Sequence, residues 1–331
     1  MNLEKIKKSL KDKPDFRIQQ IKKWVFKDLI TDWEEATTLP AKLRKELSEK
    51  FPLKIKAKKF ISKDEKTIKA LFPLKDNLKI ESVLMRYDDR NTICVSSQVG
   101  CPLNCSFCAT GKMGFKRNLE TYEIINQVLF FARLLKKENN KVTNIVFMGM
   151  GEAFLNYDNV IKSIEILNDP EGFNLGIRSF SISTAGIVPG IKKLMKEDKQ
   201  INLAVSLNAP NNELRSELMP INKKYPLKKL LKTIDQYIEK TRRRVMFEYI
   251  MIKEVNDQDK HAKQLIRILK NRLCFLNLIP YNSTKAKFKP SSQKRIRKFK
   301  KILKKEGVTV TQRYRFGDKI SAACGQLTSK K

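Results

Sequence analysis

The stretch CVSSQVGCPLNCSFCATG, residues 94–111, contains four of the chain's six cysteines. Three of them follow the spacing CxxxCxxC: Cys101, Cys105 and Cys108. Thiolates at this density select zinc or an iron–sulfur cluster. Three protein ligands leave one corner of such a cluster open, where a substrate or cofactor could bind. Cys94 could instead supply a fourth thiolate and close the site, and the spacing alone leaves both arrangements open.

The composition points to a polyanionic partner. The chain has 331 residues, enough for one large domain or for one medium and one small domain. Its 69 Lys and Arg against 35 Asp and Glu give a formal net charge of +34, and such an excess is typical of proteins that bind nucleic acid. An AT-rich genome would also enrich lysine, which would then form a solvated surface.

The cysteines are predicted to be metal ligands or catalytic groups. Residues 1–16 are charged throughout and predict no signal peptide, and no apolar run approaches the length of a membrane span. We therefore expect a cytoplasmic protein, whose thiols are kept reduced. The single histidine, His261, excludes mixed cysteine–histidine zinc sites and most catalytic triads.

Residues 1–75 predict a small helical module. An apolar stripe at helical spacing forms its core: Ile18, Ile21, Val25 and Leu29. Basic side chains between these positions are available to phosphates: Arg17, Lys22, Lys23 and Lys27.

From about residue 80, short apolar runs alternate with longer helical patterns. Strands are predicted at 80–86, 92–96, 143–149, 178–184, 201–207, 244–251, 275–280 and 307–313. Helices are predicted at 119–138, 157–168, 187–197, 226–240, 257–271 and 291–305. This alternation indicates parallel βαβ units. Since six units are too few for a closed eight-fold barrel, we expect an α/β fold with an incomplete (βα)6 TIM-like barrel and a site at the carboxyl ends of its strands.

Several polar or glycine-rich motifs end these strands at the same rim. Glycines allow close backbone approach, Glu152 can accept hydrogen bonds from an ammonium group, and Ser and Asn can bind carboxylate and ribose hydroxyls. These groups suit a nucleotide that carries an amino acid. Each motif alone is an ordinary strand end, and only their convergence with the cysteine loop indicates a site. The motifs are Gly149 to Glu152, Ser181 and Ser183, Ser206 to Asn208, and Pro280 to Asn282.

The order and wording of the motifs resemble the RlmN/Cfr family of rRNA adenine methyltransferases, in the radical S-adenosylmethionine (SAM) superfamily. Even PDFRIQQIKKWVF, residues 14–26, resembles that family's N-terminal accessory domain. The resemblance covers essentially the whole chain. It is carried by CVSSQVGCPLNCSFCATG, GFKRNL, FMGMGEA, SISTAGIVPGI, SLNAPNNELRSELMPINKKYP, EYIMIKEVND, NLIPYN and AACGQL.

The resemblance implies two cofactors. Cys101, Cys105 and Cys108 would hold a 4Fe-4S cluster whose fourth iron binds SAM, and reduction would cleave SAM to a radical. The positions that match the family's SAM contacts are Gly151, Glu152, Ser183, Ser206, Leu207, Asn208 and Asn282.

The resemblance also implies three catalytic residues. Cys324, in AACGQL, would be methylated by one SAM and would carry the methyl group to adenine after a second SAM is used. Cys94 would release the product through a transient disulfide with Cys324. Glu81 matches the proton acceptor.

The expected substrate is an adenine in 23S rRNA at the peptidyl transferase centre, methylated on carbon 2, with tRNAs as further substrates. Two alternatives are a Cfr-type enzyme that methylates carbon 8 and a non-enzymatic RNA-binding protein with a structural metal site. A flavodoxin- or ferredoxin-type electron donor, no membrane partner and a monomer are expected. The domains would be an accessory RNA-binding domain (1–75), a linker strand (76–86), the radical SAM core (87–319) and a C-terminal segment with the methyl-carrier cysteine (320–331).

Overall fold

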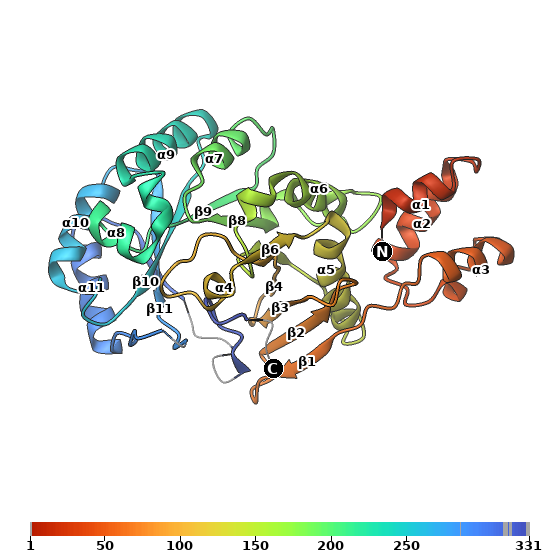
Figure 1. The fold of residues 1–331 in the computed structure, drawn as a ribbon. Coiled ribbons are helices and arrows are strands. Elements are labelled where there is room, and N and C mark those ends of the chain that lie inside the picture. Colours follow the sequence, from red (N-terminus) through yellow and green to blue (C-terminus); the bar gives the residue numbers. More distant parts are fainter. Residues whose placement is uncertain (1, 285, 314–316, 318–319, 329–331) are drawn as a thin grey trace.

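A computed structural model describes residues 2–284, 286–313, 317 and 320–328. Its main feature is a curved ten-stranded sheet in the order β1-β2-β3-β4-β7-β8-β9-β10-β11-β12 (Figure 1). The strands are β1 (Lys58–Ile61), β2 (Thr67–Pro73), β3 (Lys79–Arg86), β4 (Asn91–Cys94), β7 (Asn144–Phe147), β8 (Phe180–Thr184), β9 (Asn202–Ser206), β10 (Val245–Met251), β11 (Cys274–Pro280) and β12 (Val310–Gln312). From β4 to β12 all neighbours are parallel, whereas β1, β2, β3 and β4 pair antiparallel.

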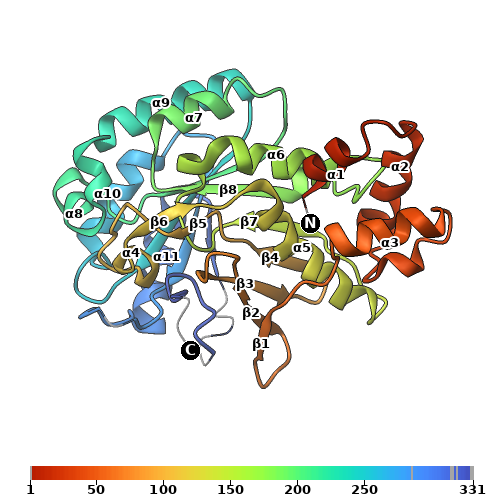
Figure 2. The same ribbon diagram turned by 45° about the vertical axis from the view of Figure 1, so that its right-hand side comes forward.

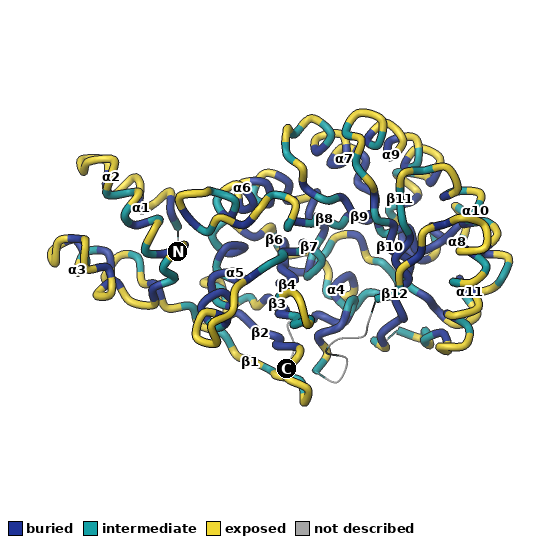
Figure 3. The backbone as a smooth tube through the Cα atoms, turned by 180° about the vertical axis from the view of Figure 1, so that it is seen from behind, coloured by how far each residue is buried: buried dark blue, intermediate teal, exposed yellow. Residues whose placement is uncertain are grey.

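Helices cover the outer face of the curved sheet, and their exposed sides form the surface of the molecule (Figures 1 and 3). They are α5 (Thr121–Lys136), α6 (Tyr157–Asn168), α7 (Val188–Leu194), α8 (Asn212–Leu218), α9 (Leu227–Thr241), α10 (Asp259–Leu269) and α11 (Gln293–Lys305). The longer helices bury an apolar stripe, as α5 does with Ile124, Val128, Phe131 and Leu135, because residues three or four apart share a helix face. The inner strands β7 and β8 alternate buried and half-buried residues, because one face packs against the helices and the other faces the inside of the barrel.

The fold class is confirmed. All eight predicted strands and all six predicted helices are present, with ends that differ by a few residues. The parallel strands and their helices form the expected incomplete barrel, because β1 and β12 are opposite edges of the sheet and do not pair. A second, two-stranded sheet, in which β5 (Gln98–Gly100) pairs with β6 (Phe115–Asn118), is not indicated by any of the predicted strands.

Three short helices form the N-terminal module, which lies beside α5 and α6 (Figure 2). They are α1 (Leu3–Ser9), α2 (Phe16–Lys22), continued by the π-helical turn Lys23–Lys27, and α3 (Ala41–Lys50). Trp33, Ile21 and Val25 are buried in the module's core. Lys22, predicted to be available to phosphates, instead forms a 2.7 Å ion pair with Asp169, beyond the end of α6. This contact helps to fix the module on the barrel.

The predicted domain boundaries at residues 75 and 86 stay predictions, and that at residue 319 lies outside the described residues. The N-terminal helices end at Lys50, and the next segments, β1 and β2, are already part of the large sheet. Among the described residues, no helix is both long and apolar enough to cross a membrane.

Candidate active site

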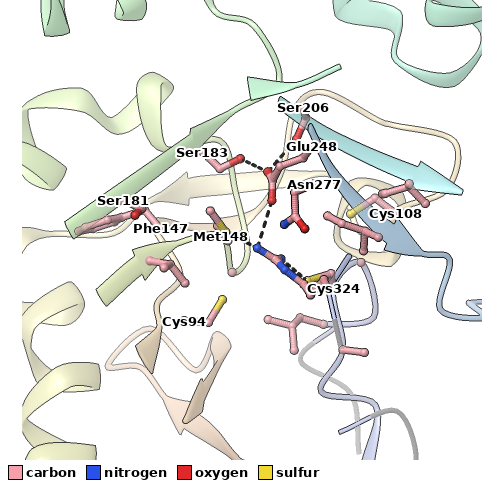
Figure 4. A pocket seen from close by; sticks show the side chains of 18 of the residues that line it. Cys94, Cys108, Phe147, Met148, Ser181, Ser183, Ser206, Glu248, Asn277 and Cys324 are labelled. Atoms are coloured by element: carbon pink, nitrogen blue, oxygen red, sulfur yellow. Dashed lines mark hydrogen bonds and ion pairs between the residues drawn. The ribbon is translucent and has the colours of Figure 1, made fainter. Parts of the chain in front are cut away.

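A cavity of about 670 Å³ lies inside the barrel and reaches the carboxyl ends of the parallel strands. Cysteines from three segments line it: Cys94 at the end of β4, Cys101, Cys105 and Cys108 in the loop after β5, and Cys324 near the C-terminus. Figure 4 shows Cys94, Cys108 and Cys324 around this space. The volume is in the usual range for a pocket that takes a nucleotide-sized ligand. The five cysteines that the sequence analysis singled out therefore share one site.

The two-stranded sheet β5–β6 holds the base of the cysteine loop. Gly100 has φ +73°, and a Cβ there would lie 1.7 Å from the carbonyl oxygen of Gly114, so only glycine fits. The backbone N–H of Cys101 donates to the same oxygen at 3.1 Å. At the far side of the loop, the N–H of Ser106 donates to the carbonyl of Leu218 at 2.9 Å. The loop is thus fixed from both sides.

The three loop thiols suit an iron–sulfur cluster better than a single metal ion. Within the described ranges, no three His, Cys, Asp or Glu side chains converge on an ion-sized site. A cluster does not require such convergence, because each cysteine binds a different iron. Burial raises the pKa of Cys101 to about 12 and also raises the pKa values of Cys105 and Cys108, so the free thiols are protonated at neutral pH. Binding of a cluster would therefore displace their protons.

Arg215 places a buried positive charge near this loop. Burial lowers its pKa to about 10, and the charge of Cys105 opposes that shift. Its guanidinium donates to the carbonyls of Ala185 at 2.7 Å and of Ser206 and Leu207 at 3.2 Å each. Arg215 thereby ties the carboxyl ends of β8 and β9 together.

The motif Gly149 to Glu152 follows β7, as predicted. Gly151 has φ +98°, and a Cβ would lie 2.5 Å from the Cβ of Gln98. Glu152 is buried, and its carboxylate accepts from the backbone N–H of Ala185 at 2.7 Å and of Phe154 at 3.1 Å. Burial raises the pKa of Glu152 to about 7, although these hydrogen bonds oppose the shift. Both residues line the cavity, and the carboxylate has lone pairs left for a ligand.

The other predicted SAM contacts divide into two groups. Ser183, Ser206, Asn208 and Asn282 line the cavity, but Leu207 is fully buried and is not part of the lining that the described residues form. Asn208 has φ +56°, and its Oδ1 accepts from the N–H of Ile250 at 2.9 Å. The Oδ1 of Asn282 is buried with no hydrogen-bond partner among the described residues. An unpaired buried acceptor in the lining fits a donor on a polar ligand such as SAM.

Residues 320–328, here called the C-terminal strap, bring Cys324 to the cavity. Hydrogen bonds hold the strap at Cys324, Gln326 and Leu327. The side-chain amide of Asn282 donates to the carbonyl of Cys324 at 3.3 Å, and that of Gln326 donates to the carbonyl of Ser283 at 3.0 Å. Thr110, beside the cysteine loop, donates its hydroxyl to the carbonyl of Leu327 at 2.7 Å.

Glu81 lies under the strap rather than in the cavity lining of the described residues. Its carboxylate forms a buried 2.8 Å ion pair with Lys69 and accepts from the backbone N–H of Thr328 at 2.8 Å. The antiparallel register places Val83 opposite Cys94. Glu81 therefore lies beyond the carboxyl end of β4, at the rim of the barrel.

The predicted disulfide is not formed in this structure. All six cysteines, each of them within the described residues, are free. Cys94 is buried and Cys324 is half-buried, and both line the same cavity. Burial raises the pKa of Cys94 to about 12, and the charge of Cys324 adds to the shift.

Two charged residues of the site were missed in the sequence. Glu248, on β10, accepts hydrogen bonds from Ser183 at 2.6 Å and from Ser206 at 3.4 Å (Figure 4). Arg313, directly after β12, donates to the sulfur of Cys324 at 3.1 Å. A signal for Glu248 was present, because it is the one acidic residue inside the apolar run 244–251. Arg313 ends the last predicted strand, but the many basic residues of this chain hide it.

The chain is similar to known proteins over nearly its whole length. The sequence profile of the Radical SAM superfamily matches residues 95–266, and that of the ribosomal RNA large subunit methyltransferase N-terminal domain matches residues 1–53. A protein of Dictyoglomus turgidum named "Probable dual-specificity RNA methyltransferase RlmN" is 48% identical over 315 residues, 95% of this chain and 90% of the relative. A protein of the same name from Geobacillus kaustophilus is 47% identical over 323 residues, 96% of this chain and 88% of the relative.

The crystal structure of a radical SAM methyltransferase from Sphaerobacter thermophilus superposes with a TM-score of 0.96 at 44% identity, covering 100% of this chain and 98% of that one. Membership in a family of enzymes excludes the alternative of a non-enzymatic RNA-binding protein. The chain belongs to the radical SAM superfamily, whose members use a 4Fe-4S cluster and SAM, and within it to the RlmN family of RNA methyltransferases.

Proposed function

We propose that this protein methylates carbon 2 of an adenine in 23S rRNA, at the peptidyl transferase centre, and the corresponding carbon in tRNA, through a methyl group carried on Cys324. The observation that carries the proposal is that Cys324, from the end of the chain, lines the same cavity as Cys94 and the three loop cysteines. The relatives' names support RNA as the substrate.

Cys101, Cys105 and Cys108 would hold the cluster, which supplies the electron that cleaves SAM. The chain's own residues prepare its binding site. Arg215 adds a positive charge beside the cysteine loop, which favours an anionic group there. Glu152 and the unpaired oxygen of Asn282 offer acceptors to SAM.

Cys324 would first receive a methyl group from SAM acting as a substrate. The thiolate attacks the methyl carbon, the new S–C bond forms, and the C–S bond to the sulfonium breaks to release S-adenosylhomocysteine. One hydrogen atom of this methyl group would then pass to the radical that a second SAM supplies, and its carbon would bond to the adenine, one electron returning to the cluster, so that the RNA is tethered to Cys324.

Cys94, which is buried in the same cavity, would resolve the tether. Its sulfur would attack the sulfur of Cys324, the S–S bond of a transient disulfide would form, and the C–S bond would break to leave the new methyl group, which takes up a proton, on the adenine. Glu81 would accept the proton of the adenine carbon from its place at the rim.

Mass spectrometry of nucleosides identifies the methylated carbon. RNA from cells with and without the gene is digested, and we expect 2-methyladenosine to be lost from rRNA and tRNA with the gene. A product methylated on carbon 8 would instead assign the Cfr-type reaction. The electron donor, a flavodoxin or ferredoxin, and the monomeric state stay predictions of the sequence.

The variant Cys94→Ala tests the role of the cysteine pair. Without the resolving thiol, RNA should stay covalently attached to Cys324, and the adduct should migrate as a protein band that nuclease treatment shifts. Cys274→Ala is the matched control. Cys274 is also half-buried, but it is the first residue of β11, at the opposite end of that strand from the rim of the barrel. Free methylated RNA at the normal yield from Cys94→Ala would contradict the resolving role.

A further inference from the structure

Arg313 links the buried carboxylate of Glu248 to the sulfur of Cys324. One guanidinium nitrogen, Nη1, donates to the Sγ of Cys324 at 3.1 Å, and the other, Nη2, forms an ion pair with Oε1 of Glu248 at 3.4 Å. Figure 4 labels Glu248 and Cys324, and dashed lines lead from both to the unlabelled side chain between them. The three residues come from different segments, namely β10, the end of β12 and the C-terminal strap. The contact therefore exists only in the folded chain.

Glu248, Arg313 and Cys324 are each held by further hydrogen bonds to neighbouring residues. The backbone N–H of Arg313 donates to the carbonyl of Leu278 at 2.9 Å, which extends the pairing of β12 with β11. The other carboxylate oxygen of Glu248 accepts from the hydroxyls of Ser183 and Ser206. The strap is bound at Cys324 itself and at Gln326 and Leu327, which follow it, by the contacts described above. The guanidinium consequently meets the sulfur from a fixed direction.

The electrostatics favour a charged guanidinium. Burial by itself would lower the pKa of Arg313, but Cys324 and Glu248 together raise it above its ordinary value. A guanidinium is a planar fork that can donate to two acceptors at once, and here it reaches a carboxylate and a sulfur. A charged N–H donor stabilises a sulfur anion more than it stabilises a neutral thiol.

We propose that Arg313 is a positioning residue that aims the sulfur of Cys324 into the cavity and favours its thiolate form, while Glu248 holds the guanidinium in place. The thiolate is the nucleophilic form of cysteine. The inference rests on the proposed function of Cys324 as the methyl acceptor, and it assigns to Arg313 and Glu248 the preparation of that acceptor.

The rate at which iodoacetamide alkylates Cys324 reports the fraction of this cysteine that is thiolate. The sulfur attacks the methylene carbon, an S–C bond forms, and iodide leaves. Trypsin releases Cys324 within residues 320–330 and Cys274 within residues 273–285, each as the only cysteine of its peptide. Cys274 thus serves as an internal reference thiol. The experiment uses cluster-loaded, reduced protein whose Cys324 peptide has the mass of the unmethylated form.

Three variants separate a positioning role from a general structural one. Arg313→Gln should lower the labelling rate of Cys324, relative to that of Cys274, roughly three- to tenfold. Without the guanidinium a smaller fraction of Cys324 is thiolate, and this loss outweighs the higher nucleophilicity of the thiolate that remains. Arg313→Lys keeps the charge but not the fork, and should give an intermediate rate. Arg243→Gln is the matched control and should leave the ratio unchanged. Arg243 precedes β10 and donates to Asn202, the first residue of β9, so it lies at the amino ends of these strands.

The inference would be overturned if Arg313→Gln unfolds at the same urea midpoint as the wild type and also keeps the wild-type ratio of Cys324 labelling to Cys274 labelling. If that variant does not fold, Arg313→Lys decides: a rate equal to that of the wild type contradicts the need for the fork. A different experiment tests the proposed function, so its failure can be told apart from failure of this inference. RNA methylation by Cys324→Ala would overturn the methyl-carrier role whatever the labelling shows, whereas normal labelling in the Arg313 variants leaves that role intact.

Discussion

Ala109 donates its backbone N–H to the carbonyl oxygen of Gly325 at 2.8 Å. Ala109 is the first residue of the short helix α4 (Ala109–Lys112), where an N–H has no partner within the helix. The acceptor comes from the C-terminal strap. The bond therefore joins the residue after Cys108 to the residue after Cys324 and makes one wall of two segments that are far apart in the sequence.

Thr110→Val should loosen this wall. The change removes the hydroxyl that donates to Leu327 at 2.7 Å and leaves a buried carbonyl unpaired, at a cost of about 1 kcal/mol or more. Opening of the strap should then expose the amide of Ala109, whose hydrogen exchange should accelerate roughly fivefold or more. Thr233→Val is the control, because Thr233 bonds to Lys229 within α9. Equal acceleration in both variants would mean that the strap contact is not the cause.

Lys69→Met should strongly destabilise the fold. Lys69 and Glu81 form a buried ion pair with side chains 7% and 1% exposed, and removal of the cation leaves a buried carboxylate without its partner. We expect a loss of about 3–5 kcal/mol in the free energy of unfolding, measured in urea. The double variant Lys69→Met/Glu81→Gln should recover most of this loss. A double variant no more stable than Lys69→Met would show that the effect is not electrostatic.

His261 should titrate below its ordinary pKa of 6.5. Burial, followed by the charge of Lys260, lowers the pKa of this imidazole, whose Nδ1 accepts the N–H of Gln258 at 3.2 Å and caps α10. Since the folded pKa lies below the unfolded value, the stability that His261 contributes is complete above about pH 6.5 and is lost as the pH falls through the folded pKa. His261 is the single histidine, so its NMR resonance is assigned without ambiguity.

The variant His261→Gln provides the control for this titration. Glutamine keeps a side-chain acceptor at the capping position but does not titrate. Urea unfolding midpoints at about pH 7 and about pH 5 should therefore differ less in this variant than in the wild type. An imidazole that titrates at or above 6.5 in the folded protein would contradict the prediction.

Gly151→Ala should cost more stability than Gly307→Ala. Both glycines have a positive φ, +98° and +81°, so both alanine variants carry a backbone penalty of about 1 kcal/mol. A Cβ at residue 307 would meet nothing within 4 Å, whereas one at residue 151 would lie 2.5 Å from the Cβ of Gln98. The clash should add about 1–3 kcal/mol to the loss in urea unfolding free energy. Equal losses would mean that Gln98 moves away without cost.

The barrel was predictable because its signals are local. Apolar runs such as 201–207 and helical patterns such as 119–138 follow from burial on a strand or a helix face, and their alternation determines a parallel sheet. The edge strand β1 gave a weak signal, since its exposed residues include Lys58 and Lys59 and it is extended only because it pairs with β2. Leu207 is buried and lies outside the lining that the described residues form, so its contact with SAM stays a prediction.

The sequence by itself determined the three-cysteine loop, the glycine turns and the order of strands and helices, because each depends on neighbouring residues and on periodicity. Only the tertiary structure decided which distant groups meet. Glu248 and Arg313 have no motif in common. Glu248 contacts Arg313, and Arg313 contacts Cys324, because parallel strands end at one rim and the strap is bound across it. Long-range contacts of this kind depend on sheet register and burial, which no local pattern encodes.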